Sequence, residues 1–190
     1  MMKKLLATTA VLALVAAASA DISAYLVGPT AVSLTAGPAE YYDLYVSVTN
    51  GDDWTVGGMR AVTDTDFYQD AMNDGNPPNP AFFGFVPDSE YTSFYTSPGD
   101  WPNAAYDGAI VGIAAMNDGP GVLDADYFDT INTGDGDFLV ARITILNGGT
   151  LGGEFLYASV NDPTLQTLIL PEPASLALLV LGGLVVARRR

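Results

Sequence analysis

The sequence has no cysteine and no histidine among its 190 residues. Without cysteine the chain can form no disulfide and no thiolate metal site, and it has no cysteine nucleophile. Without histidine it lacks the commonest general base and the commonest zinc ligand. These two absences remove most familiar catalytic arrangements. We therefore expect a protein that is not an enzyme, with no catalytic residues and no cofactor, calcium being the one ion that the sequence leaves open.

Basic residues are almost as scarce in the central part of the chain. The stretch from Asp21 to Pro173 carries all 22 acidic residues and only two basic ones, Arg60 and Arg142, so its net charge is −20. Nucleic-acid binding requires Lys or Arg side chains that replace the counterions of the phosphates. We therefore expect no nucleic acid as a partner, and a solvated acidic surface instead.

The N-terminus has the three parts of a secretory signal. A positive start (Met1 to Lys4) precedes an apolar stretch (Leu5 to Ala17), and the small residues Ala18, Ser19 and Ala20 come just before Asp21. This order predicts a signal peptide over residues 1–20, cut by signal peptidase between Ala20 and Asp21. The protein is therefore expected to be exported.

The C-terminus also reads as a targeting segment. Two prolines, Pro171 and Pro173, force an extended approach and allow a helix to begin directly after them. Residues 174–187 would form about 21 Å of helix, which is short against a hydrocarbon core of about 30 Å. The arginines that follow place the C-terminus on the cytoplasmic side. We expect a transmembrane helix and basic tail over residues 174–190, with the body outside.

The combination of Pro171, Glu172 and Pro173 with an apolar segment and the final Arg188, Arg189 and Arg190 resembles the PEP-CTERM sorting tail of bacterial exported proteins. The resemblance covers residues 171–190. It implies recognition by the membrane protease exosortase, cleavage near the two prolines, and a final place at the cell surface or in an extracellular matrix made alongside exopolysaccharide. A plain membrane anchor without processing is the alternative.

The body alternates apolar and polar residues with the period of two that is typical of strands. One face of a first clear strand carries Tyr42, Leu44, Val46 and Val48, and the other carries Asp43, Tyr45 and Ser47. The turn residues Asn50 and Gly51 follow, and Trp54 to Val62 resumes the extended pattern, which predicts a hairpin.

A late strand from Phe138 to Leu146 is the clearest of all. Its core-facing residues are expected to be Leu139, Ala141, Ile143 and Ile145, with Arg142 and Thr144 facing solvent. Further strands are expected at Ile22 to Val27, Ala31 to Leu34, Ala81 to Val86, Tyr91 to Tyr95, Ala109 to Met116 and Glu154 to Val160.

Helical patterns with caps are missing outside the two ends, and glycine and proline punctuate the chain. The class is therefore all-β: an antiparallel β-sandwich, jelly-roll or cohesin-like, flanked by an N-terminal signal helix and a C-terminal transmembrane helix. We expect the sandwich domain at 21–165 and a linker that contains the proline motif at 166–173.

Two loop regions offer candidate sites. Asp124, Asp126, Asp129, Asp135 and Asp137 form the densest acidic cluster, and alternating carboxylates suit calcium. The spacing departs from an EF-hand because Phe128 occupies the fifth position, so a solvated loop of turn-forming aspartates is the alternative. Trp101, in a loop rich in proline and glycine, could stack on a sugar ring or could pack on the core.

These patterns favour one function and leave two alternatives open. The first is a non-catalytic exported surface or matrix protein whose partners are signal peptidase, exosortase and the membrane. The second is a carbohydrate-binding module that acts on exopolysaccharide. The third is a secreted hydrolase, which needs two facing carboxylates about 5 to 9 Å apart, although no feature of the sequence selects such a pair.

Overall fold

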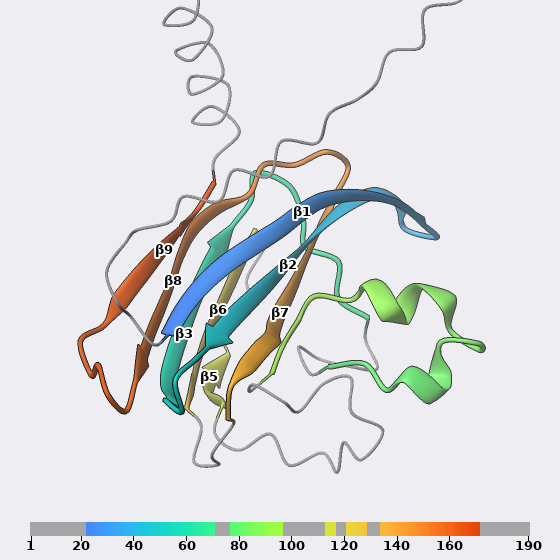
Figure 1. Cartoon of the computed structure of the whole chain (residues 1–190). Helices are drawn as coiled ribbons and strands as arrows, with labels where there is room; N and C mark the ends of the chain where they lie inside the picture. Colours follow the sequence, from blue (N-terminus) through green and yellow to red (C-terminus); the bar gives the residue numbers. More distant parts are fainter. Residues whose placement is uncertain (1–21, 71–76, 97–112, 117–120, 129–133, 172–190) are drawn as a thin grey trace, which may run out of the picture.

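The computed structural model describes residues 22–70, 77–96, 113–116, 121–128 and 134–171. Within these ranges the chain forms nine strands and two short 3₁₀ helices (Figure 1). The strands are β1 (Ile22–Leu34), β2 (Gly37–Val48), β3 (Trp54–Val62), β4 (Phe94–Tyr95), β5 (Ile113–Met116), β6 (Val122–Phe128), β7 (Gly136–Leu146), β8 (Gly152–Ser159) and β9 (Gln166–Leu170), and the helices are η1 (Pro80–Phe82) and η2 (Pro87–Tyr91).

The strands form two antiparallel sheets, which confirms the all-β class. The four-stranded sheet has the order β1-β2-β7-β4, and the five-stranded sheet has the order β5-β6-β3-β8-β9. Figure 1 shows β1 and β2 in front, with β3, β8 and β9 behind them. In the part of the chain that the structure describes, no helix has the length and apolar character to cross a bilayer. Both expected terminal helices lie outside the described residues.

Among the residues that the structure describes, one hydrophobic cluster joins the two sheets. Leu44, Val46 and Val48 of β2 enter it from one sheet, and Met59 of β3 and Phe155 of β8 enter it from the other. All five side chains are at most 1% exposed. Burying a side chain of this size contributes about 1.5 to 3 kcal/mol, so the alternating pattern of each strand fixes which face turns inward. The predicted inward face of β2 is confirmed.

The expected hairpin between β2 and β3 is wrong. β2 pairs with β1 and β7, whereas β3 pairs with β6 and β8 in the other sheet. Asn50 and Gly51 do turn the chain, with φ of 59° and 69°. The two aspartates that follow lengthen the connection, and Trp54 then starts β3 inside the core at 1% exposure. The chain therefore crosses from one sheet to the other instead of folding back.

Of two further expected strands, residues 81–86 form no strand and residues 91–95 form one only at their end. Residues 81–86 contain most of η1, and residues 91–95 contain the end of η2 and the two-residue strand β4. Each helix begins with a proline, Pro80 or Pro87, whose fixed φ and missing N–H suit a first helical turn. The prolines therefore outweigh the β propensity of the neighbouring phenylalanines.

Two strands lie where the sequence predicted none. β6 occupies the start of the acidic stretch that was expected to be a loop, and β9 lies within residues 166–173, which were expected to be a linker. In β6 the aspartates alternate with Leu123 and Ala125, which are 1% and 0% exposed. The acidic residues of β6 thus alternate with core residues, and this stretch is a half-buried strand rather than a loop.

At the start of the described residues, the two strands expected at 22–27 and 31–34 are one strand, β1, with a register shift between Val27 and Thr30.

Candidate functional site

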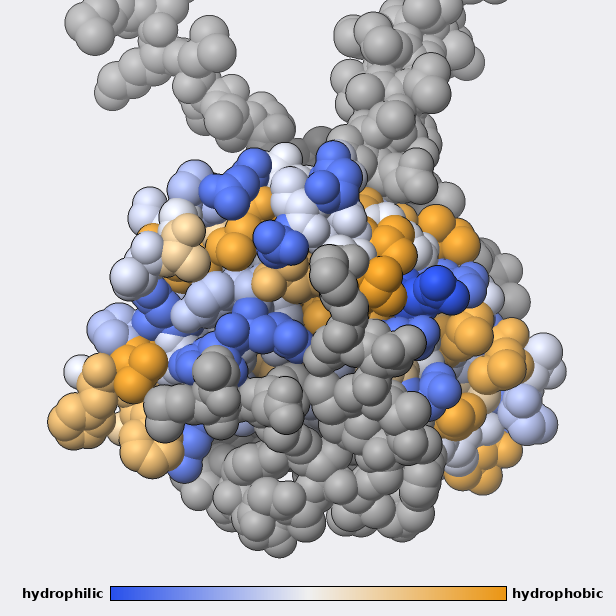
Figure 2. Space-filling view, turned by 180° about the vertical axis from the view of Figure 1, so that it is seen from behind, coloured by the Kyte–Doolittle hydropathy of each residue, from blue (hydrophilic) through white to orange (hydrophobic). Residues whose placement is uncertain are grey.

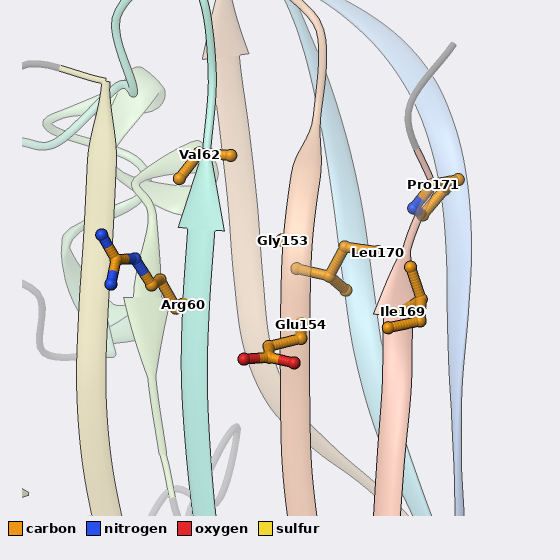
Figure 3. Close-up of a pocket in the computed structure, with 7 residues that line it drawn as sticks. All are labelled: Arg60, Val62, Gly153, Glu154, Ile169, Leu170 and Pro171. Carbon is orange, nitrogen blue, oxygen red and sulfur yellow. The ribbon is translucent and has the colours of Figure 1, made fainter. Parts of the chain in front are cut away.

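An open groove of about 540 Å³ lies beside the end of β9 on the outer face of the five-stranded sheet (Figure 3). The strand register builds it, because Arg60 of β3 lies opposite Glu154 of β8, and Glu154 lies opposite Ile169 of β9. The groove is lined by Arg60, Val62, Gly153, Glu154, Ile169, Leu170 and Pro171.

The groove combines one cation, one anion and an apolar wall. Arg60 and Glu154 are exposed, and Ile169 is 67% exposed. On its other side Arg60 lies opposite Asp124 of β6, and Figure 3 shows its guanidinium turned away from Glu154. This arrangement can hold an extended segment against apolar side chains.

Gly153 makes this part of the sheet possible. Its φ is 118°, a conformation that other residues rarely adopt, and a Cβ there would clash with the carbonyl oxygen of Arg60. Gly153 lies opposite Ala61 on one side and Leu170 on the other. The glycine therefore allows β3, β8 and β9 to approach closely at the end of the groove.

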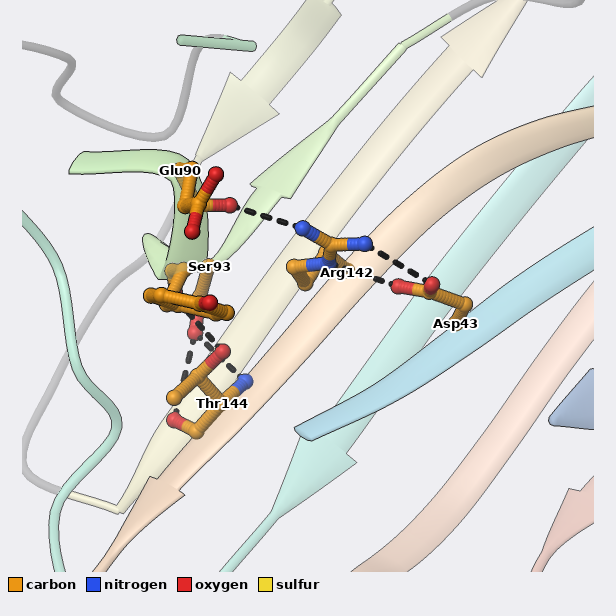
Figure 4. A network of polar contacts seen from close by, with 6 residues as sticks. Asp43, Glu90, Ser93, Arg142 and Thr144 are labelled. Carbon is orange, nitrogen blue, oxygen red and sulfur yellow. Dashed lines mark hydrogen bonds and ion pairs between the residues drawn. The ribbon is translucent and has the colours of Figure 1, made fainter. Parts of the chain in front are cut away.

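The second body arginine, Arg142, is bound within the four-stranded sheet (Figure 4). Its guanidinium donates two hydrogen bonds, of 2.7 and 2.8 Å, to the carboxylate of Asp43 on β2 and a third, of 2.7 Å, to the carbonyl of Glu90 in η2. It also lies over the ring of Tyr41, 4.6 Å from the centroid. The prediction that Arg142 faces solvent is wrong, because η2 folds over this face of β7.

Burial and hydrogen bonding act in opposite directions on Arg142. Burial lowers the pKa of the guanidinium because it disfavours the charged form, but the hydrogen bonds and charge of Asp43 outweigh it and raise that pKa overall. The side chains of both partners are only 13% exposed. Arg142 is therefore a structural cation that ties β2, β7 and η2 together.

Thr144 was also expected to face solvent and is fully buried. Its hydroxyl donates to the carbonyl of Tyr91, and its backbone N–H donates to the hydroxyl of Ser93 at 2.9 Å (Figure 4). Tyr68 donates its backbone N–H to the Thr144 carbonyl at 2.8 Å. The long connection between β3 and β4 thus covers β7. The partners of Thr144 lie 50 or more positions away in the chain, so the alternation of residues along β7 gives no sign of them.

The five aspartates proposed for calcium do not share one loop. Asp124 and Asp126 lie on β6 of the five-stranded sheet, whereas Asp135 and Asp137 lie at or near the start of β7 in the other sheet. Asp129 lies outside the described residues. The carboxylate of Asp135 accepts a 2.7 Å hydrogen bond from the backbone N–H of Gly51. Among the residues that the structure describes, no three acidic side chains are grouped to bind a metal ion.

Asp52 is a buried carboxylate whose role the local sequence does not indicate. It is 2% exposed and accepts hydrogen bonds from the backbone N–H groups of Asp53, at 2.8 Å, and Asn161, at 3.1 Å. Burial raises the pKa of the carboxyl, but these bonds and one from the Ser159 hydroxyl outweigh it, so the pKa lies below its usual value. Asp52 therefore pins the turn after β2 to the turn after β8.

The outer face of the four-stranded sheet carries a pair of stacked tyrosines. The rings of Tyr25 on β1 and Tyr45 on β2 are 5.3 Å apart and nearly parallel, at 9°. Tyr25 is 38% exposed, and burial together with the charge of nearby Asp137 raises the pKa of its hydroxyl. Ser47 of β2 lies opposite Asp137 of β7, in the row next to the tyrosines. This face offers an aromatic surface beside hydrogen-bond acceptors.

The remaining predicted site residues fall mostly beyond the described ranges. Of the proline motif, Pro171 is half-buried and lines the groove. The candidate residues that lie outside the described residues are Ala18, Ala20, Asp21, Trp101, Glu172, Pro173, Arg188, Arg189 and Arg190.

Comparison with known proteins finds no matching family model, no matching curated protein and no matching solved structure.

Proposed function

We propose that this chain is a non-catalytic exported protein of the cell surface or extracellular matrix, delivered by its PEP-CTERM-like tail. Signal peptidase removes residues 1–20, the C-terminal helix holds the precursor in the membrane, and exosortase cuts near Pro171 to Pro173. In this proposal the folded domain acts as a structural component outside the cell and catalyses no reaction.

The observation that carries this proposal is the position of the two ends of the fold. β1 begins at Ile22, which is 0% exposed and lies two residues after Ala20. β9 ends at Leu170, also 0% exposed and directly before Pro171. Both expected cuts therefore fall just outside the two sheets, and cleavage would leave every core strand in place.

The finer architecture belongs to the same proposal. We assign the two sheets to a β-sandwich of the jelly-roll or cohesin-like type, because consecutive strands repeatedly change sheet. The orders β2-β7-β4 and β6-β3-β8 place the chain alternately on the two sides of the core. Its core is formed by hydrophobic packing between the two sheets, which suits a chain without cysteine.

The test is the intact mass of the protein recovered from cells and from medium. A product that starts at Asp21 and ends near Pro173 is expected, and a product that still ends at Arg190 would refute sorting by cleavage. Pro171→Ala combined with Glu172→Gln should leave the precursor uncut. Pro163→Ala, which changes an exposed proline of the turn before β9, is the matched control and should be cut normally.

A second candidate function, contact with a neutral glycan, is favoured by the stacked pair of Tyr25 and Tyr45. Aromatic surface beside carboxylate and hydroxyl acceptors suits sugar rings, whose hydroxyls donate hydrogen bonds. Tyr25→Ala should lower binding to the producing cell's own polysaccharide, while Phe82→Ala, which removes a 48% exposed ring at the end of η1, should not. Equal binding by both variants would reject this function.

A further inference from the structure

β9 is an outer strand of the five-stranded sheet. Among the residues that the structure describes, β8 is the one strand that pairs with it in the sheet, with Leu156 opposite Thr167 and Glu154 opposite Ile169 (Figures 1 and 3). One side of an outer strand carries backbone N–H and C=O groups that the sheet does not pair. Such an edge can bind another extended strand by main-chain hydrogen bonds.

The four outer strands differ in how well they could accept a partner. β1 is interrupted by a register shift between Val27 and Thr30 and contains Pro29, which has no N–H to donate. β4 has two residues and β5 has four. β9 has five residues and, within Gln166–Leu170, no charge, no proline and no register shift. Within its length it has none of the charges, prolines or bulges that usually protect an edge strand.

The surface around β9 is also unusually apolar for this acidic body. Val160, Leu165 and Ile169 are 60%, 57% and 67% exposed. Figure 2 shows hydrophobic residues on the right of the back view, the side on which β8 and β9 lie. The nearest carboxylate on the neighbouring strand, that of Glu154, lies opposite Arg60 in the register.

Charge restricts where two copies of this chain could meet. Each body has a net charge of −20, so most ways of joining two copies would bring carboxylates together. We propose that β9 is a self-association edge, at which two copies of this chain pair antiparallel through β9 and join their five-stranded sheets across a two-fold axis. A β9 strand from a second copy is extended and uncharged, so this contact opposes no like charges.

The expected interaction is weak. A five-residue strand is about 17 Å long, and so short an edge buries less than the roughly 1,000 Å² that a stable interface requires. Pairing therefore depends on high local concentration, which anchoring at one surface would supply. This last step rests on the proposed function. Because salt screens the repulsion between the two acidic bodies, the dimer fraction should rise with ionic strength.

A cysteine scan tests the pairing in the full chain. The natural sequence has no cysteine, so every disulfide-linked dimer must come from the introduced residue. Single variants from Gln166→Cys to Leu170→Cys should show a cross-linking maximum at the position nearest the two-fold axis, where Cα atoms lie within disulfide range. Val27→Cys, a similarly exposed residue on β1 of the other sheet, is the control. Cross-linking that never exceeds this control, or that is uniform across the scan, would overturn the proposal.

Sedimentation of the protein without cysteine gives the second measurement. Dimer should increase with concentration and salt, and Ile169→Glu should reduce the association constant at least tenfold, whereas Ile169→Thr, which adds no charge, should change it far less. Equal association by the two variants would place the contact elsewhere.

The two proposals fail separately. If intact mass shows a product that still ends at Arg190 while the β9 cross-links form, the sorting proposal fails and the pairing stands. If processing is normal and no β9 cross-links form, the pairing fails and the sorting proposal stands.

Discussion

Removing the carboxylate of Asp43 should be among the most damaging single changes on the four-stranded sheet. In Asp43→Ala the guanidinium of Arg142 loses two charge-assisted hydrogen bonds and its counter-charge. It remains held beneath η2 by the carbonyl of Glu90 and by the ring of Tyr41. The cost of the change therefore lies mainly in a cation left without its partner.

The size of the effect follows from the burial of the pair. Leaving one member of a buried ion pair alone costs about 3 to 5 kcal/mol. Both side chains keep 13% exposure, so water can hydrate the abandoned guanidinium to some extent, and we expect about 3 kcal/mol. Small domains are stable by only about 5 to 15 kcal/mol, so this loss would shift unfolding visibly.

Urea unfolding followed by tryptophan fluorescence measures the change, since Trp54 is 1% exposed in the core. Asp137→Ala, an exposed carboxylate on the same sheet, is the control and should cost less than about 0.5 kcal/mol. Asp43→Ala combined with Arg142→Met should recover about 1 kcal/mol of the loss, because both charges are then absent. A loss below about 1 kcal/mol for Asp43→Ala, or a double variant as costly as the two singles added, would refute the reasoning.

Three further predictions concern the core, the acidic turn and the sheet backbone. Phe155→Ala should lower the free energy of unfolding by about 3 to 5 kcal/mol in the same urea assay, because the Phe155 side chain is fully buried. A loss under about 1 kcal/mol would contradict the placement of the core. The pKa of Asp52 is lower in the folded state than its usual value of 3.8, so the stability it contributes is present above that value and is lost as pH falls through the folded pKa. The melting temperature of the natural protein should therefore drop more steeply below about pH 4 than that of Asp52→Asn, and parallel curves would contradict this. Gly153→Ala should lower the free energy of unfolding more than Gly148→Ala does. Both glycines have positive φ, but a Cβ at Gly153 would meet the Arg60 carbonyl, whereas one at Gly148 meets nothing within 4 Å. Equal losses of stability in urea would contradict this.

The sequence predicted best those features that depend on one buried face. β3 and β7 were found close to both of their bounds and β2 at its C-terminal end, because residues such as Leu44 and Ile143 recur at every second position and are 0% exposed. The start of β2 at Gly37 was missed. The period of two shows that one face is buried. It does not show whether the opposite face is also covered, and for this reason Arg142 and Thr144 were misplaced.

Features decided by distant parts of the chain could not be predicted in this way. The turn at Asn50 and Gly51 was correct locally, but the choice of sheet for β3 depends on β6 and β8, which come more than 50 residues later. The groove beside β9 likewise combines Arg60 with Ile169, which only the register of three strands brings together. Buried Asp52 gave no local signal, because two adjacent aspartates after a turn are ordinarily solvated.

The positions of the two body arginines bear on how the protein would survive among secreted proteases. A trypsin-like enzyme cuts after Lys or Arg, and between Ile22 and Pro171 the sequence offers only Arg60 and Arg142. Both lie in inner strands: β3 runs between β6 and β8, and β7 runs between β2 and β4. A protease needs an extended segment detached from its sheet, so cleavage at either site requires the sheet to open first. Resistance to trypsin would then be a direct measure of how rarely the two sheets open, because both basic residues of this range lie in inner strands.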